Sequence, residues 1–244
     1  MKISVVIPVF REEGIAALLD DLLTRQDAYD AEFIIVDGAP EHDTLDRIAD
    51  PRVTDLRVTP PRTTAPCIIG LTSSPGRGVQ QNRGAEAASG DILLFLHADT
   101  LLPVQAFTLI RQALANPAFA GGAFSLAYVP ATPGLSFIAA AANLRSRRTR
   151  VPYGDQAIFV RHSVFRELGG FSPLPLMEDL EFMTRLRRHG HRISILAMTV
   201  RTSARRHLRE GILRCTLRNL LLRLLYHCGV RPSLLAALYR RHGV

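Results

Sequence analysis

The 244-residue chain contains no tryptophan, three cysteines and no long uninterrupted apolar stretch. The cysteines, Cys67, Cys215 and Cys228, are odd in number, widely spaced and outside any CxxC pair. Neither a disulfide framework nor a zinc site is therefore indicated. No run approaches the ~18 apolar residues of a membrane span, and the N-terminus has no small-residue cleavage site of the signal-peptide kind. These absences favour a protein of the reducing cytoplasm.

Acidic residues do not balance the basic ones, and the formal net charge is +8. The excess is concentrated in two arginine clusters, one within residues 145–150 and one within residues 201–223. Such patches attract nucleotide phosphates, acidic lipids or nucleic acid. Zinc-finger spacing and aromatic-rich RNA-binding signatures are both missing. We therefore expect no nucleic-acid partner and look to the other anions.

Acidic residues do follow three apolar runs that have the character of buried strands. Glu12 follows ISVVIPVF, Asp37 follows FIIV, and Asp99 ends ILLFLHAD. The carboxyl ends of parallel strands form the ligand crevice of an open α/β sheet, so this pattern gathers carboxylates around one site. Such an arrangement suits a phosphate ligand that is bound through a metal ion.

Strand and helix patterns alternate through the first half of the chain, which predicts a mostly parallel sheet flanked by helices. Residues Thr59–Pro75 are rich in Pro, Thr and Ser and predict an irregular insertion with a short strand at Cys67–Leu71. The expected strands are Ile3–Ile7, Phe33–Val36, Val53–Val58 and Ile92–Leu96, and the expected helices lie at 15–23, Thr44–Ala49, Val79–Ala88 and Val104–Ala115.

The second half changes character. Gly121–Val129 and Gln156–Arg161 predict antiparallel strands, separated by an alanine-rich helix and the first arginine cluster. A helix opens at Glu178-Asp179, and a strand is expected near Ile193–Val200. Beyond Ser203 the chain becomes a basic, leucine-rich helical tail. We expect one α/β domain over residues 1–203 and a helical extension over residues 204–244.

Several segments together resemble the family 2 glycosyltransferases, which have the GT-A fold. They are SVVIPVFREEG, FIIVDGAP, GRGVQQNRGAEAASGDILLFLHADT, YGDQAIFVRHSVFRELGGF and MEDLEF, in the family's order and approximate spacing. The tail TSARRHLREGILRCTLRN is similar to a bacterial subgroup described as radical-SAM/selenodomain-associated glycosyltransferases. The resemblance covers nearly the whole chain.

The resemblance implies a binding site for a nucleotide-sugar donor. Pro8, Phe10 and Glu12 match the first nucleotide-contacting loop, Asp37 matches the residue that reads the base, and Arg77, Gly78, Gln81 and Asn82 match the segment near the ribose and phosphates. Asp99 ends the segment where the family has its DxD motif, although His97 replaces the first Asp. The resemblance thus makes Asp99 a ligand of Mg²⁺ or Mn²⁺, which neutralises the charge developing on the leaving diphosphate.

Two further roles follow from the same resemblance. Glu178-Asp179 matches the ED motif, in which the general base of inverting transfer resides, and Asp179 is our first choice, with Glu178 second. GT-A enzymes often recruit a C-terminal histidine to the metal, which makes His207 a candidate ligand. Each assignment has a plainer alternative: Asp179 and Asp99 as helix caps, Asp37 as a turn residue, and His207 as a surface histidine.

These inferences predict a metal-dependent, inverting glycosyl transfer to an unidentified acceptor. One alternative is transfer onto a polyprenyl phosphate at the membrane face, with an acceptor that is already anionic. Another is a non-catalytic protein that binds sugar nucleotides or a lipid surface. The tail bears on both, because Leu213, Leu217, Leu220 and Leu224 fall on one stripe flanked by arginines. That stripe predicts either a peripheral helix on an anionic membrane or a helix packed on the catalytic domain.

Overall fold

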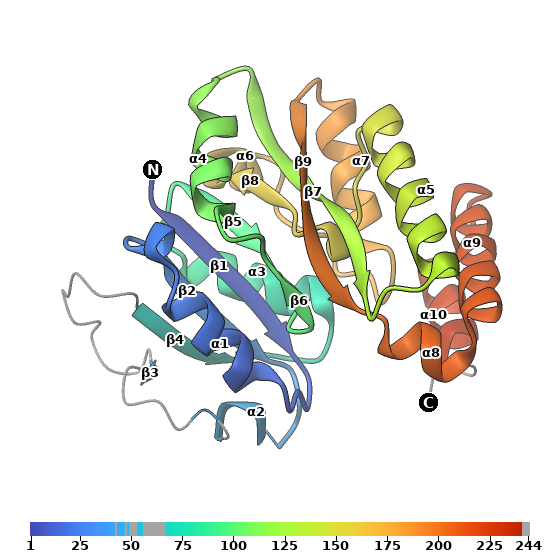
Figure 1. The fold of residues 1–244 in the computed structure, drawn as a ribbon, viewed down its shortest axis with the longest axis horizontal. Helices are drawn as coiled ribbons and strands as arrows, with labels where there is room; N and C mark the ends of the chain where they lie inside the picture. Colours follow the sequence, from blue (N-terminus) through green and yellow to red (C-terminus); the bar gives the residue numbers. More distant parts are fainter. Residues whose placement is uncertain (42, 47, 49–52, 56–66, 241–244) are drawn as a thin grey trace.

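β1 is an inner strand of the sheet, and its side chains are buried on both faces. The computed structural model describes residues 1–41, 43–46, 48, 53–55 and 67–240. Val5 and Ile7 point into one core cluster and Val6 into the other. A strand that is buried on both faces requires helices on both sides. Figure 1 shows this layered arrangement.

The described residues form one nine-stranded sheet in the order β3-β4-β2-β1-β5-β8-β7-β9-β6. Pairing is parallel from β3 to β5 and again between β7 and β9, whereas β8 is antiparallel to both of its neighbours. The strands are β1 (Ile3–Val9), β2 (Glu32–Asp37), β3 (Val53–Asp55), β4 (Cys67–Thr72), β5 (Ile92–Phe95), β6 (Thr100–Leu101), β7 (Phe119–Val129), β8 (Phe159–Arg161) and β9 (Arg192–Ser203).

Helices cover both faces of this sheet. One face packs against α1 and α4, and the opposite face packs against α3, α6 and α7. The helices are α1 (Ile15–Leu23), α2 (Asp43–Asp46), α3 (Arg77–Ala87), α4 (Ala106–Ala115), α5 (Pro133–Thr149), α6 (His162–Glu167), α7 (Glu178–Arg188), α8 (Arg205–Glu210), α9 (Ile212–His227) and α10 (Pro232–Arg240). Short 3₁₀ turns lie at Gln26–Ala28 and Gly154–Gln156.

The expected α/β class, the mostly parallel sheet and the antiparallel β7–β8 pair are confirmed. The strand at Cys67 was expected as a short piece of an irregular insertion, but β4 is an inner strand between β3 and β2. Residues 59–66 of that insertion, and parts of the expected segments Thr44–Ala49 and Val53–Val58, lie outside the described residues. β6 was not expected, because two residues are too few for a periodicity signal.

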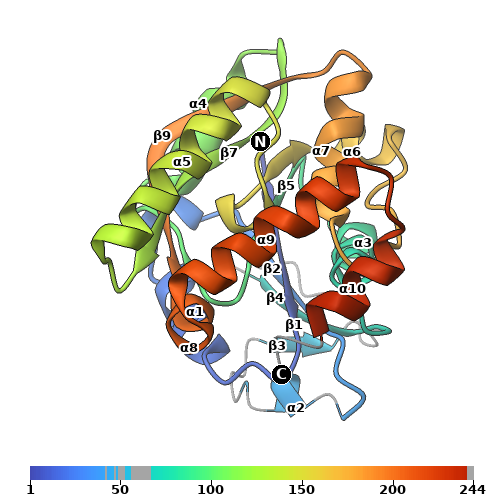
Figure 2. The same ribbon diagram turned by 90° about the vertical axis from the view of Figure 1, so that its right-hand side faces the viewer.

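The C-terminal helices pack against the rest of the chain. Cys215 and Leu222 of α9 and Leu235 of α10 are buried. Tyr239 of α10 lies between the guanidinium groups of Arg206 and Arg218, 4.9 Å from each. Figure 2 shows α9 crossing in front of the sheet, with α8 and α10 beside it. Among the described residues, no helix combines the length and apolar character needed to span a bilayer.

The contact of α3 with the sheet leaves no room for a side chain at Gly84. A Cβ at that position would lie 2.4 Å from Val6 Cγ1 and 3.1 Å from Val36 Cγ2. We expect Gly84→Val to reduce the free energy of unfolding by ~1–3 kcal/mol, because overpacking forces α3 away from β1 and β2. Gly134→Ala is the control, since its nearest neighbour is 3.8 Å away. Equal urea midpoints for the two variants would contradict the tight packing.

Candidate functional site

One large cleft, of about 1830 Å³, opens where the carboxyl ends of β1 and β5 meet the C-terminal helices. The loop after β1, the segment after β5, the start of α3 and the start of α7 supply its walls on the sheet side. Residues of α8, α9 and α10 supply the opposite wall. The cleft therefore lies where ligands bind in open α/β sheets.

The loop after β1 brings the first predicted residues to this cleft. Pro8, Phe10 and Glu12 all line it, and the Phe10 side chain is 51% exposed. Glu12 Oε2 lies 3.8 Å from Arg205 Nη2, so the loop also contacts α8. An exposed aromatic ring beside the cleft offers a stacking face for a planar base.

Asp37 lies at the end of β2 but does not line the cleft. Its side chain is buried, and its two carboxylate oxygens accept hydrogen bonds from the backbone N–H groups of Ala39 (2.9 Å) and Thr44 (3.1 Å). These bonds have the geometry of the turn chemistry considered above. Asp37 shapes the chain that leaves β2.

The start of α3 places Arg77 in the cleft, 3.6 Å from the Glu178 carboxylate. Gly78 is buried behind this pair, and a Cβ on it would lie 3.0 Å from Ser172 O. The next turn of the helix does not bring its predicted residues to the cleft. Gln81 is buried, and the Asn82 side chain exchanges two 2.8 Å hydrogen bonds with the backbone of Phe171.

Gln80, rather than Gln81, faces the cleft. Its amide nitrogen donates to the carbonyl oxygens of Val9 (2.7 Å), the last residue of β1, and Val36 (2.8 Å), the last residue but one of β2. The sequence analysis did not identify this residue. Successive side chains of a helix point about 100° apart. The sequence pattern alone does not show which of two adjacent glutamines faces the cleft.

His97 and Asp99 both line the cleft just beyond β5. Asp99 is exposed, and its carbonyl oxygen accepts a hydrogen bond from Ser203 N, which joins this segment to β9. The Nε2 atom of His97 is buried and has no hydrogen-bond partner among the described residues. Burial, reinforced by Arg77 and Arg206, holds the pKa of His97 well below its usual value, so the imidazole is neutral near pH 7.

Gly154 brings His97 and Asp179 close together. Its N–H donates to Asp179 Oδ2 at 2.6 Å. A Cβ on Gly154 would lie 2.8 Å from His97 Nε2 and 3.3 Å from Asp179 Oδ2. The absence of a side chain at position 154 is therefore what allows the imidazole and the carboxylate to converge.

The two acidic residues at the start of α7 have different surroundings. Asp179 lines the cleft, and its second oxygen accepts from Leu180 N at 2.7 Å, so two backbone N–H groups orient the carboxylate. Glu178 is 4% exposed. Burial, and then the neighbouring Asp179, raise the pKa of Glu178, while Arg77 opposes the shift. Asp179 is the more accessible carboxylate.

A second group of cleft residues was missed by the sequence analysis. Arg145 stacks 3.4 Å above the ring of Tyr153, and Arg223 of α9 donates to the Tyr153 hydroxyl at 3.3 Å. Beside them, burial and the nearby Asp179 raise the pKa of Asp155 to about 6. The motif YGDQ was recognised as part of the family resemblance, but the acid within it was not singled out.

The donor set fits a metal ion that is shared with a ligand. No group of three or more His, Cys, Asp or Glu side chains that could hold a metal occurs among the described residues. His207 is 8% exposed, and its ring lies 4.9 Å from that of Tyr128. Burial lowers the pKa of His207, which favours the neutral form that ligates metals. One carboxylate, Asp99, suits Mg²⁺, which commonly binds one or two carboxylates plus substrate phosphates.

Residues 4–137 match the sequence profile described as "Glycosyl transferase family 2". The chain belongs to this family. The expected recognition is thus confirmed. Of the three carboxylates predicted to gather around one site in this family 2 glycosyltransferase, Glu12 and Asp99 line the cleft and Asp37 does not. No curated protein matches the chain.

Solved structures share the fold at low sequence identity. TarS 1–349 from S. aureus is 17% identical, with a TM-score of 0.64, and the match covers 86% of this chain and 63% of that one. The same protein in complex with UDP-GlcNAc is 19% identical, with a TM-score of 0.60 and coverages of 83% and 58%. The mannosyltransferase PcManGT from Pyrobaculum calidifontis, in complex with GDP-Man and Mn²⁺, is 17% identical, with a TM-score of 0.61 and coverages of 82% and 56%. The chain spans less than two thirds of the length of each.

The raised pKa of Asp155 predicts a pH-dependent stability difference. A carboxyl that ionises at about 6 in the folded state and near 3.8 in the unfolded state destabilises the fold as pH rises between these values, by up to ~3 kcal/mol. The free energy of unfolding of Asp155→Asn, minus that of the wild type, should therefore increase from about pH 4.5 to about pH 7, because the wild-type carboxyl is forced to ionise over this range.

Urea unfolding at the two pH values measures this difference. Asp20→Asn is the matched control, because Asp20 is exposed on α1 and away from the cleft. The control difference should not change with pH. A pH-independent difference for Asp155→Asn would show that its carboxyl is not held in its neutral form by the fold.

Proposed function

We propose that this family 2 glycosyltransferase catalyses metal-dependent, inverting transfer of a sugar from a nucleotide-sugar donor. The observation that carries the proposal is that Asp99, after β5, and Asp179, at the start of α7, face one cleft from separate elements. One carboxylate can hold the metal ion at the leaving diphosphate, and the other can accept the proton of the attacking hydroxyl. The subgroup suggested by the tail remains a prediction.

The donor is assigned to the side of the cleft formed by β1, α3 and β5. Phe10 presents its exposed ring to the base, and Arg77 lies where it can exchange its contact with Glu178 for a phosphate oxygen. Pro8 and Glu12 complete this wall. Asp37, Gly78, Gln81 and Asn82 support it from behind, because none of them lines the cleft.

We assign the bound cation, Mg²⁺ or Mn²⁺, to Asp99, with His207 as a further candidate ligand. When bound, the ion neutralises the charge that develops on the leaving diphosphate. A neighbour that binds GDP-Man together with Mn²⁺ supports this assignment by its shared fold. The neutral His97 adds no positive charge of its own beside Asp99.

Asp179 is assigned as the general base. Hydrogen bonds from Gly154 N and Leu180 N fix the direction of its carboxylate, which then accepts the proton of the acceptor hydroxyl. Glu178 is mostly buried against Arg77 and is assigned a positioning role. Inversion follows from a single displacement in which one base acts and no carboxylate nucleophile intervenes.

A specific observation also supports an anionic acceptor. Arg145 and Arg223 both contact the Tyr153 ring in the same cleft as Asp179, and neither forms an ion pair with a carboxylate among the described residues. A phosphate acceptor, such as a polyprenyl phosphate, would find complementary charge there. In that case Asp179 need not remove a proton. We place either reaction in the cytoplasm, in keeping with three free cysteines.

Asp99→Asn tests the metal assignment through binding rather than turnover. The amide keeps the side-chain volume but loses the anionic ligand, so Mn²⁺ should no longer strengthen binding of UDP or GDP. Calorimetry with and without Mn²⁺ measures this effect, and Asp20→Asn serves as the control on an exposed aspartate. A Mn²⁺ enhancement equal to that of the wild type would remove Asp99 from the metal site.

Asp179→Asn tests the base. Single-turnover rates should fall by at least ~10²-fold with little change in donor affinity, because proton removal matters mainly in the transition state. Glu178→Gln, the matched neighbour, should lose less. A role in helix capping predicts instead a lower melting temperature with the rate per folded molecule preserved. A stable, fully active Asp179→Asn enzyme would favour the phosphate acceptor, which requires no base.

A further inference from the structure

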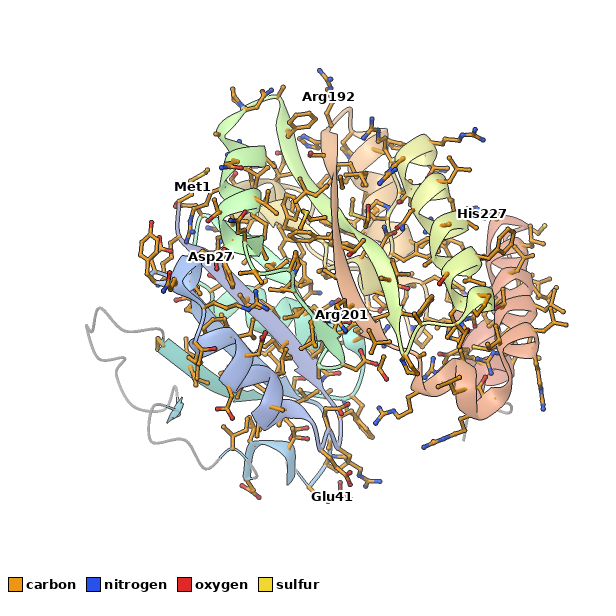
Figure 3. The ribbon with its side chains drawn as sticks, in the orientation of Figure 1. Met1, Asp27, Glu41, Arg192, Arg201 and His227 are labelled. Carbon is orange, nitrogen blue, oxygen red and sulfur yellow. The ribbon has the colours of Figure 1, made fainter. Side chains whose placement is uncertain are left out.

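The C-terminal helices α9 and α10 both carry exposed leucines. Figure 2 shows α9 and α10 at the surface of the face that is turned toward the viewer. In Figure 3, where His227 marks the end of α9, side chains of this helix project away from the sheet. We call this set the outer leucine face, and its members and exposed fractions are Leu213 (71%), Leu217 (54%), Leu220 (44%), Leu221 (55%), Leu224 (54%), Leu234 (58%) and Leu238 (44%).

α9 has two faces with different environments. Cys215 and Leu222 are buried, and Asn219 and Arg223 line the cleft, so the inner side of the helix is part of the site. The spacing of the exposed leucines, at i, i+4, i+7, i+8 and i+11 from Leu213, places them on the opposite side. One side of α9 therefore packs on the fold, as one interpretation of the tail predicts. The other side faces solvent.

The charge around the outer leucine face has one dominant sign. Glu210 is the single acidic residue in the sequence from 204 to 244. It lies close to Arg218 and 3.9 Å from Arg206, so its charge is offset within the helices. Arg209, Arg214 and Arg231 are exposed. An apolar helix face flanked by arginines matches an interface between acyl chains and anionic headgroups.

We propose that the outer leucine face binds an anionic lipid surface, with α9 and α10 lying in the plane of the headgroups. Charge favours this occupant over a second copy of the chain, since a symmetric dimer through this face would bring two arginine-rich surfaces together. The proposal rests on the proposed function, which it extends by naming the surface on which the enzyme works.

The same helix then connects the membrane to the cleft. Leu220 belongs to the outer leucine face and also lines the cleft, so the cleft opens beside the docked surface. Arg223, one turn further along α9, reaches Tyr153 inside the cleft. A lipid-linked acceptor would enter the site along this wall, with its polar head directed toward Arg145 and Arg223.

Co-sedimentation with vesicles tests the docking. Two vesicle types are compared, one of phosphatidylcholine alone and one of phosphatidylcholine mixed equally with phosphatidylglycerol. The wild type should bind the mixed vesicles and release them at high salt, because the arginines contribute through screened charge. The triple variant Leu217→Gln, Leu221→Gln, Leu224→Gln should bind them at least ~10-fold more weakly, since three leucines no longer enter the acyl region.

Two measurements make the test decisive. The double variant Val104→Gln, Met198→Gln removes exposed apolar side chains from the α/β part and should bind vesicles like the wild type. Neither substituted set lines the cleft, so both variants should bind UDP or GDP like the wild type. A wild type that binds neither UDP nor GDP would contradict the proposed function. The vesicle measurements would still test the docking proposal.

Other outcomes would overturn the docking proposal. These are a wild type that ignores anionic vesicles, or a triple variant that binds them normally while its melting temperature matches that of the wild type. Light scattering adds a third: a wild-type dimer that the triple variant abolishes, together with no vesicle binding, would show that the outer leucine face is covered by a second copy.

Discussion

The hydrogen bond from Gly154 N–H to Asp179 Oδ2 is the interaction on which the arrangement of the site depends. It joins the turn before β8 to the start of α7, 25 residues later in the chain. The turn also carries Tyr153 and Asp155, so the same bond places the stacked arginine and the second carboxyl beside Asp179. Because position 154 has no side chain, His97 approaches from β5 and completes the floor of the cleft.

The charges of the cleft are arranged in opposed pairs. Arg77 meets Glu178, Arg205 meets Glu12, and Arg206 meets Glu210. In each pair the arginine side chain is more than half exposed, whereas the carboxylate side chain is only 5–19% exposed. The exposed guanidinium groups are therefore accessible to an incoming phosphate. Arg145 differs, because two of its nitrogen atoms are buried without hydrogen-bond partners and its guanidinium lies on an aromatic ring. The cleft therefore holds both accessible arginines and one buried arginine that is stacked on an aromatic ring.

Much of the fold follows from the sequence, because strands buried on both faces, such as β1 and β5, are almost entirely apolar and are soon followed by polar residues. Asp99 and Asp179 could be placed at the cleft for that reason and through the family's motif order. Gln81 was placed at the site instead of Gln80, since one residue along a helix changes direction by about 100°. The place of Asp155 in the cleft and its raised pKa depend on residues that are distant in the sequence, and no local sequence pattern shows these contacts.

The cleft is lined by residues that lie far apart in the sequence. Its lining runs from Pro8, in the first strand, to Tyr239, in the last helix. Domains generally begin to fold from the N-terminal side while synthesis continues. The sheet can thus form before the wall made by α8, α9 and α10 has left the ribosome. A nascent chain that had emerged only as far as β9 would hold an open half-site, and the full cleft would form only after α8, α9 and α10 had emerged.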